Sequence, residues 1–179
     1  MMMKRIWAMP NHNTFSIKPI KELIDRYIQT GTWIDPFARN SPFNAICQRT
    51  NDLNPEAATT DHLEALEFLQ LFADESVDGV LFDPPYSPRQ ISECYKQVGR
   101  EVHIKDTQSS FYGDRKKEIA RIVKPNGIVI SCGWNSGGIG KTLGFELLEI
   151  LLVPHGGAHN DTIVTVEKKF PQTVDMLSL

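Results

Sequence analysis

The stretch that most constrains the fold is a short apolar run, residues 77–82, that ends in Asp83-Pro84-Pro85-Tyr86. An apolar run bounded by turn residues is typical of a strand buried inside a parallel sheet. The two prolines can neither extend the sheet nor donate to it, so the chain must leave the sheet there. The sequence therefore predicts a carboxylate and an aromatic ring at the carboxyl end of a strand, where open α/β sheets bind ligands.

This tetrapeptide suits a flat base that carries an amino group. Asp83 and the carbonyl of Pro84 can each accept one amine hydrogen, and Tyr86 can stack on the ring. The rival interpretation is structural: a strand followed by a proline-rich loop, with Asp83 capping a neighbouring backbone group.

Strand-like and helix-like segments alternate through most of the chain. Helices are expected over 18–28, 62–72 and 114–123, and shorter helical stretches near 41–47 and 139–143. Strands are expected at 32–37, 49–54, 57–60, 77–82, 128–132, 146–153 and 161–169, the last two as an antiparallel pair. Irregular segments are expected at 1–16 and 87–113. This order predicts an α/β fold with a Rossmann-like, doubly wound, mostly parallel sheet and an antiparallel edge strand.

Bulk properties narrow the function classes. The 179 residues fit one domain, and no stretch approaches the ~18 apolar residues of a membrane helix. The three cysteines, Cys47, Cys94 and Cys132, match neither a disulfide framework nor a zinc pattern. We therefore expect a cytoplasmic protein that uses no metal and no membrane.

Charge is distributed unevenly although the net charge is only −3. Residues 89–124 hold nine basic and five acidic side chains, so this segment carries +4 and the remainder −7. The basic segment follows the candidate site directly and could meet phosphates. A solvated loop and helix face explains it equally well.

Three further acids, Asp35, Asp52 and Asp61, each end a predicted strand. Successive carboxyl ends line one edge of a doubly wound sheet, so we expect these side chains near Asp83. Asp52 lies 17 residues after Asp35, close to the ~20-residue offset at which an acid receives the ribose hydroxyls in Rossmann-like folds. Each acid alone would more often be a cap or a solvated strand end.

The motifs along the chain are, in order, Lys18-Pro19, Asp35-Pro36-Phe37, Asp52, Asp61 and Asp83-Pro84-Pro85-Tyr86. This order resembles that of the S-adenosylmethionine-dependent amino-methyltransferases, and among them the DNA adenine-N6 methyltransferases of the small phage or prophage kind. The resemblance covers nearly the whole chain. It implies a single methyltransferase domain over 1–179, with a cofactor-binding half at 17–76 and a catalytic half at 77–170, in which the loop 87–113 faces the substrate.

The resemblance also implies S-adenosylmethionine as cofactor, DNA as partner, and a role for each motif. The cofactor would be bound by Phe15, Ser16, Ile17, Lys18, Asp35, Pro36, Phe37, Asp52, Asp61 and His62. Within this set, Asp52 would hold the ribose and Asp61 the adenine N6. The catalytic motif would be Asp83, Pro84, Pro85 and Tyr86, with Tyr86 stacked on a flipped adenine.

The sequence departs from the family where Gly-x-Gly usually follows Asp-Pro-Phe, because this chain has Ala38-Arg39-Asn40. The chain also lacks room for a separate recognition domain. Strict sequence specificity would therefore require a homodimer in which both subunits contact the DNA bases. The alternatives left open are N4-cytosine methylation of DNA, N6-adenine methylation of RNA, and a non-catalytic nucleic-acid-binding module on the same fold.

Two weaker patterns favour structure over function. Residues 137–142 end in Gly140-Lys141-Thr142 like a phosphate-binding loop, but position 135, where that loop needs glycine, is Asn135. His155 and His159 have the spacing of helical metal ligands, but two glycines between them favour a hairpin turn.

Overall fold

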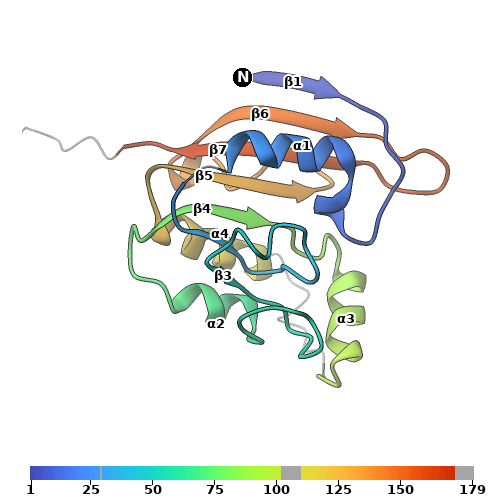
Figure 1. Cartoon of the computed structure of the whole chain (residues 1–179), viewed down its shortest axis with the longest axis horizontal. Coiled ribbons are helices and arrows are strands. Elements are labelled where there is room, and N and C mark those ends of the chain that lie inside the picture. The colour runs from blue at the N-terminus through green and yellow to red at the C-terminus, as the bar shows by residue number, and fades with distance from the viewer. Residues whose placement is uncertain (29, 102–109, 172–179) are drawn as a thin grey trace, which may run out of the picture.

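A computed structural model describes residues 1–28, 30–101 and 110–171, and shows a seven-stranded sheet with helices on both faces (Figure 1). The strand order is β1-β6-β7-β5-β4-β2-β3. The strands are β1 (Met2–Arg5), β2 (Trp33–Asp35), β3 (Arg49–Thr50), β4 (Val77–Phe82), β5 (Val123–Gly133), β6 (Phe145–Val153) and β7 (Thr162–Lys169). The helices are α1 (Lys18–Tyr27), α2 (Ala65–Gln70), α3 (Pro88–Gln97) and α4 (Ser110–Ile122), with 3₁₀ turns at Thr14–Ser16 and Lys141–Leu143.

The predicted fold class is confirmed, and among the described strands only β7 runs against the others. The antiparallel strand was expected at an edge of the sheet, but it lies inside it. β7 lies between β5 and β6, and the short β1 extends the sheet beyond β6. In Figure 1 the arrowheads of β1, β4, β5 and β6 all point to the right, toward α3. This shared direction gathers the carboxyl ends of the parallel strands at one edge of the sheet.

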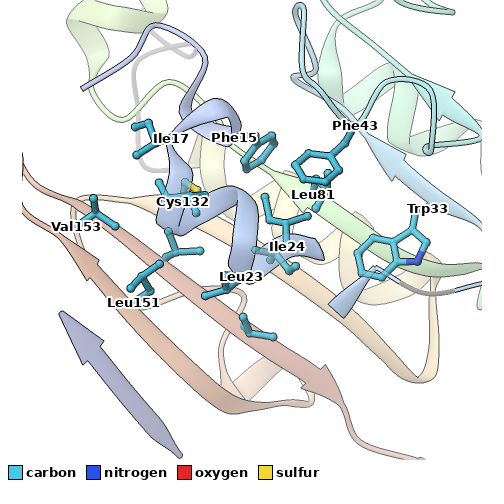
Figure 2. Close-up of a cluster of buried hydrophobic side chains, with 14 of the residues drawn as sticks. Phe15, Ile17, Leu23, Ile24, Trp33, Phe43, Leu81, Cys132, Leu151 and Val153 are labelled. Carbon is cyan, nitrogen blue, oxygen red and sulfur yellow. The ribbon is translucent and has the colours of Figure 1, made fainter. Parts of the chain in front are cut away.

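One face of the sheet is covered by α1. Its residues Ile20, Leu23 and Ile24 are buried, as the helical spacing of the apolar residues predicts. Figure 2 shows Leu23 and Ile24 among side chains from the strands, including Leu81 and Leu151. Burying such aliphatic side chains stabilises the fold by roughly 1.5–3 kcal/mol each.

The other face is covered by α2 and α4. Val80 and Phe82 alternate with Leu81 along β4 and face this second layer, where Phe68 of α2 and Ile119 of α4 are buried. β4 is therefore buried on both faces, which explains its nearly continuous apolar sequence.

Gly79 is required in β4 by its neighbour in the sheet. Trp33 of β2 is paired with Gly79, and a Cβ added at Gly79 would lie 2.5 Å from the indole ring. The glycine therefore lets the buried Trp33 pack flat against the central strand.

Several sequence-based expectations were wrong. Residues 2–5 form β1, a parallel edge strand, instead of an irregular arm. Residues 57–60 form no strand; a single bridge joins Asn51 to Asp61 instead. Residues 41–47 form turns instead of a short helix.

The expected loop at 87–113 contains α3 and the start of α4, while 102–109 lie outside the described residues. Two signals for α3 were readable. Ser87 caps it by accepting from the Gln90 amide at 3.3 Å, and Pro88 occupies the first turn. Ile91 and Tyr95, one helical turn apart, are its buried residues.

In the part of the chain that the structure describes, no helix is long and apolar enough to cross a bilayer.

Candidate active site

A cavity of about 1040 Å³ opens at the carboxyl ends of β2, β3 and β4. Each strand contributes side chains from just beyond its last residue: Pro36 and Phe37 after β2, Asp52 after β3, and Asp83 after β4. The volume is near the upper end of the usual range for cofactor and small-molecule pockets. These strand ends meet at the cavity as the sequence predicts.

The motif predicted to be catalytic lies in the wall of this cavity. Asp83, Pro84, Pro85 and Tyr86 all line it. The Tyr86 hydroxyl donates to Oδ1 of Asp83, and the Thr14 side chain also hydrogen-bonds to this carboxylate. Burial raises the pKa of Asp83, while the hydrogen bonds from Tyr86 and Thr14 oppose that shift. Asp83 is therefore a desolvated carboxylate that still faces open space.

The backbone after Asp83 is held firmly in place. The Tyr86 amide donates to Oε1 of Gln90 at 2.6 Å, and the Tyr112 hydroxyl donates to the Pro85 carbonyl. The Pro84 carbonyl accepts no hydrogen bond from the described residues, so it remains free for a ligand.

Asp35 lies below the cavity and does not line it. This side chain is fully buried, its Oδ1 accepts from the Phe37 amide at 2.9 Å, and its Oδ2 has no partner among the described residues. Burial, and next the charges of Asp83 and Asp52, raise the pKa of Asp35 well above its ordinary value. Asp35 thus shapes the Pro36-Phe37 turn and supplies an unsatisfied acceptor beneath it.

Asp52, which is predicted to hold the ribose, lines the cavity. It faces the cavity two residues after the β3 segment that pairs with β2, and Leu53 lines the same region. Its Oδ1 accepts from the Asn54 amide at 2.8 Å, which fixes the turn and leaves the second oxygen for a ligand.

Asp61 and His62 are not brought into the cavity. Asp61 forms a two-bond ion pair with Arg49, from Nε at 2.8 Å and Nη2 at 2.7 Å, and this pair lowers the pKa of Asp61. His62 is exposed and lies near the Asp52 carbonyl outside the cavity. The expectation that Asp61 receives the adenine amine is therefore contradicted by its pairing, which sequence position alone cannot reveal.

The segment from Phe15 to Lys18 contributes less than expected. Ile17 lines the cavity, Phe15 is part of the core, and Ser16 and Lys18 are exposed away from the cavity. Lys18 is 3.9 Å from Glu22 on the outer side of α1. Thr14 is the residue of this region that reaches Asp83, and no sequence signal had identified it.

Two further segments that sequence reasoning did not assign to the site contribute to the cavity lining. They are residues 10–14 of the N-terminal arm, before α1, and the turn from β6 into β7, with His155, Ala158, His159, Asn160 and Thr162. His155 joins them. Its Nδ1 donates to the Ala8 carbonyl at 2.8 Å, because a carbonyl can only accept, and its Nε2 lies 2.9 Å from Thr162 Oγ1. The expected hairpin is confirmed by the β6–β7 pairing, and the buried His155 secures the arm to it.

An aromatic pair stands beside Asp83. The Tyr86 and Trp134 rings meet edge to face at 5.7 Å, and Trp134 lines the cavity while 42% exposed. A flat ring bound near Asp83 would therefore meet aromatic surfaces.

At the opposite side of the cavity, Glu64 accepts hydrogen bonds from Arg115 of α4 and Tyr95 of α3. This buried group ties α2, α3 and α4 together around the cavity. Ion pairs within the protein also account for part of the positive charge in the basic segment, residues 89–124. Arg115, Arg121 and Lys124 each pair with an acid of the protein. These side chains are structural, which removes them from the set expected to meet phosphates.

Among the described residues, no group of three or more His, Cys, Asp or Glu side chains is arranged to hold a metal ion.

Comparisons with solved structures identify this architecture. The structure is similar to a SAM-dependent methyltransferase from Archaeoglobus fulgidus, with a TM-score of 0.60 and 9% identity over 85% of this chain and 92% of that chain. The fold is that of the S-adenosylmethionine-dependent methyltransferases.

Other solved proteins share this methyltransferase fold. They include the N-methyltransferase NodS from Bradyrhizobium japonicum (TM-score 0.57, 11% identity, 90% of this chain and 100% of that chain). A 1,6-didemethyltoxoflavin-N1-methyltransferase from Burkholderia thailandensis is also similar (TM-score 0.57, 14% identity, 86% of this chain and 78% of that chain). No protein-family model and no curated protein sequence matches the chain.

Proposed function

We propose that the chain is an S-adenosylmethionine-dependent methyltransferase that methylates the exocyclic N6 of adenine in DNA. The observation that carries this proposal is the geometry of Asp83 and Pro84: a partly buried carboxylate and a free carbonyl at the end of β4, in one cavity with the Asp52 carboxylate. The fold supports S-adenosylmethionine-dependent methyl transfer in general, and the family resemblance of the Asp-Pro-Pro-Tyr motif supports adenine N6 as the acceptor.

The residues present fit the cofactor at three points. Asp52 has a carboxylate oxygen free for the ribose hydroxyls, Leu53 and Tyr95 offer apolar walls for an adenine ring, and Pro36 and Phe37 line the side nearest Asp83. Asp35 leaves one buried oxygen unsatisfied under this wall. S-adenosylmethionine, when bound, would supply an electrophilic methyl group on a sulfonium.

The chain's own task is to make a weak nucleophile attack. The lone pair of a base amine is delocalised into the ring, so two acceptors are needed to favour a tetrahedral nitrogen. Asp83 and the Pro84 carbonyl are such acceptors, and the carboxylate also stabilises positive charge developing on the nitrogen. The Tyr86 hydroxyl already occupies Asp83 Oδ1, so the incoming amine must share or displace that bond.

A second candidate substrate is a small heteroaromatic amine, and the charge of the cavity favours it. Five acids line the described part of the cavity, Asp52, Glu56, Glu64, Asp83 and Glu93, against a single Lys or Arg, which is Arg39. A site that follows a nucleic-acid backbone is usually positive. The similar Burkholderia enzyme was solved with the heterocycle 1,6-didemethyltoxoflavin and S-adenosylhomocysteine bound, which supports this class of acceptor.

Labelled methyl transfer tests both candidates in one experiment. The purified protein is incubated with labelled S-adenosylmethionine and, in parallel, duplex DNA, single-stranded DNA, RNA, or adenine nucleosides, and products are separated as nucleosides. We expect N6-methyladenine from DNA. Label recovered on cytosine N4, on RNA or on free nucleosides identifies the corresponding alternative. Transfer to none of them, with no cofactor binding, supports the non-catalytic module.

Asp83→Asn is the decisive variant. It keeps the shape and one acceptor oxygen but loses the charge, so we expect the rate to fall by about 10²–10³-fold, as when a transition-state hydrogen bond is removed. Cofactor affinity should change little. Asp25→Asn on α1 is the matched control, because that carboxylate is exposed and pairs only with Lys21 in the described structure. Parent activity in Asp83→Asn would remove Asp83 from the mechanism.

A further inference from the structure

Arg39 occupies an unusual place in the loop after β2. Its φ is +46°, a region that residues other than glycine rarely adopt. The amino-methyltransferases that the sequence resembles usually have glycine in this loop. Neighbours hold the loop on both sides of it: the Ala38 amide donates to the Asn51 carbonyl at 2.8 Å, and the Asn44 side chain donates to the Arg39 carbonyl at 2.8 Å. Backbone conformations of this kind persist where the surrounding structure enforces them, often at functional sites.

The guanidinium of Arg39 is the only Lys or Arg group among the described residues that line the cavity. Within the part of the chain that the structure describes, it forms no ion pair with a carboxylate, and its side chain hydrogen-bonds to Cys94 Sγ of α3 at 4.0 Å. It also lines a small hollow of about 20 Å³ with Asn13, Thr14 and Asp83. Arg39 is thus an exposed arginine that lines an acidic cavity and has no carboxylate ion-pair partner among the described residues.

We propose that Arg39 binds the carboxylate of the cofactor's methionine part; this inference rests on the proposed cofactor. S-adenosylmethionine carries two cationic groups, the ammonium and the sulfonium, and one carboxylate. The acids of the cavity suit the two cations, whereas the carboxylate needs a positive partner there. A guanidinium can bind a carboxylate through two parallel hydrogen bonds, which gives both charge and orientation.

The position of Arg39 supports this role. It follows Pro36 and Phe37 by two to three residues and so stands beside the wall that the family resemblance assigns to the methionine part. Its charge reaches the catalytic end of the cavity, because it lowers the pKa of Asp83. In this arrangement Arg39 replaces the close backbone approach of a glycine loop with a side-chain contact.

The test compares ligands that differ in the carboxylate. Calorimetry measures binding of S-adenosylhomocysteine, its α-methyl ester, and 5′-methylthioadenosine, which lacks the amino-acid part, to wild type and to Arg39→Gly. Glycine suits the positive φ, so the variant should fold with a melting temperature equal to or above that of wild type. Arg39→Lys keeps the charge without the planar fork, and Lys141→Ala removes an exposed positive charge away from the cavity.

We expect Arg39→Gly to weaken S-adenosylhomocysteine binding by about 10-fold or more and to change binding of the ester and of methylthioadenosine by less than about twofold. The S-adenosylhomocysteine affinity of Arg39→Lys should lie between those of wild type and Arg39→Gly, and the affinity of Lys141→Ala should equal that of wild type. Unchanged S-adenosylhomocysteine affinity in Arg39→Gly overturns the inference, as does an equal loss for all three ligands, which would show a loop effect. If wild type binds none of the three ligands, the proposed function fails instead.

Discussion

The carboxylate of Asp35 should destabilise the folded protein at neutral pH, and Asp35→Asn tests this directly. The side chain is fully buried, one oxygen accepts from the Phe37 amide, and the other has no partner among the described residues. Asparagine keeps the first bond and removes the buried charge. Asparagine still leaves one buried polar atom without a partner, but an unpaired charge costs more to bury than an unpaired neutral group, so we expect the variant to gain about 1–3 kcal/mol in free energy of unfolding near pH 8.

The gain should depend on pH in a defined direction. The pKa of Asp35 is raised well above its ordinary value of 3.8, chiefly by burial. Between 3.8 and the raised pKa, the folded state binds more protons than the unfolded state, so wild-type stability from this group falls as pH rises. The variant lacks this dependence, so its advantage should be small near pH 3.5 and largest above the raised pKa.

Urea denaturation of both proteins from pH 3.5 to pH 8 measures the difference. For a chain of this size, each kcal/mol shifts the melting temperature by roughly 2–4 °C, so calorimetry provides an independent check. Asp25→Asn on the surface of α1 serves as the control, with an expected change below about 0.5 kcal/mol. A less stable Asp35→Asn at pH 8, or a difference that does not change with pH, would refute the reasoning.

Two further predictions concern the residues that the tertiary structure reassigned. Asp61→Asn should lower the free energy of unfolding by about 1 kcal/mol in urea denaturation, because it weakens the partly exposed ion pair with Arg49. Calorimetry should find S-adenosylhomocysteine affinity within about twofold of wild type, and a tenfold loss would return Asp61 to the cofactor site. His155→Phe should lower stability by about 1–3 kcal/mol, because Ala8 and Thr162 lose their buried partner. Limited proteolysis should then cut the N-terminal arm faster, and an unchanged cleavage rate would show that His155 does not hold it.

Elements with strong local patterns were predictable from the sequence. α1 follows from its apolar spacing after Pro19, and β4 follows from an apolar run that two prolines end. In both cases the local preference agrees with burial on the side that the pattern indicates. Since parallel strands share one direction, the meeting of Asp52 and Asp83 at one cavity also followed from the order of segments.

Elements stabilised by distant partners were not predictable in the same way. β1 is a four-residue strand with every side chain exposed, so it has no apolar pattern and exists through pairing with β6. Asp61 has the position of a cofactor ligand along the chain, yet Arg49 pairs with it. Thr14 reaches Asp83 from a segment 69 residues earlier, and no local signal marks it.

What the sequence by itself determined is the alternation of strands and helices, the central strand β4 and the acidic motif where that strand ends, because burial periodicity and proline geometry act over a few residues. Only the tertiary structure decided which polar groups face the cavity, because ion pairs such as Asp61–Arg49 and contacts such as Arg39–Cys94 join residues whose separation in space the sequence does not encode locally. The availability of a charge for ligand binding depends on whether another part of the protein already neutralises it.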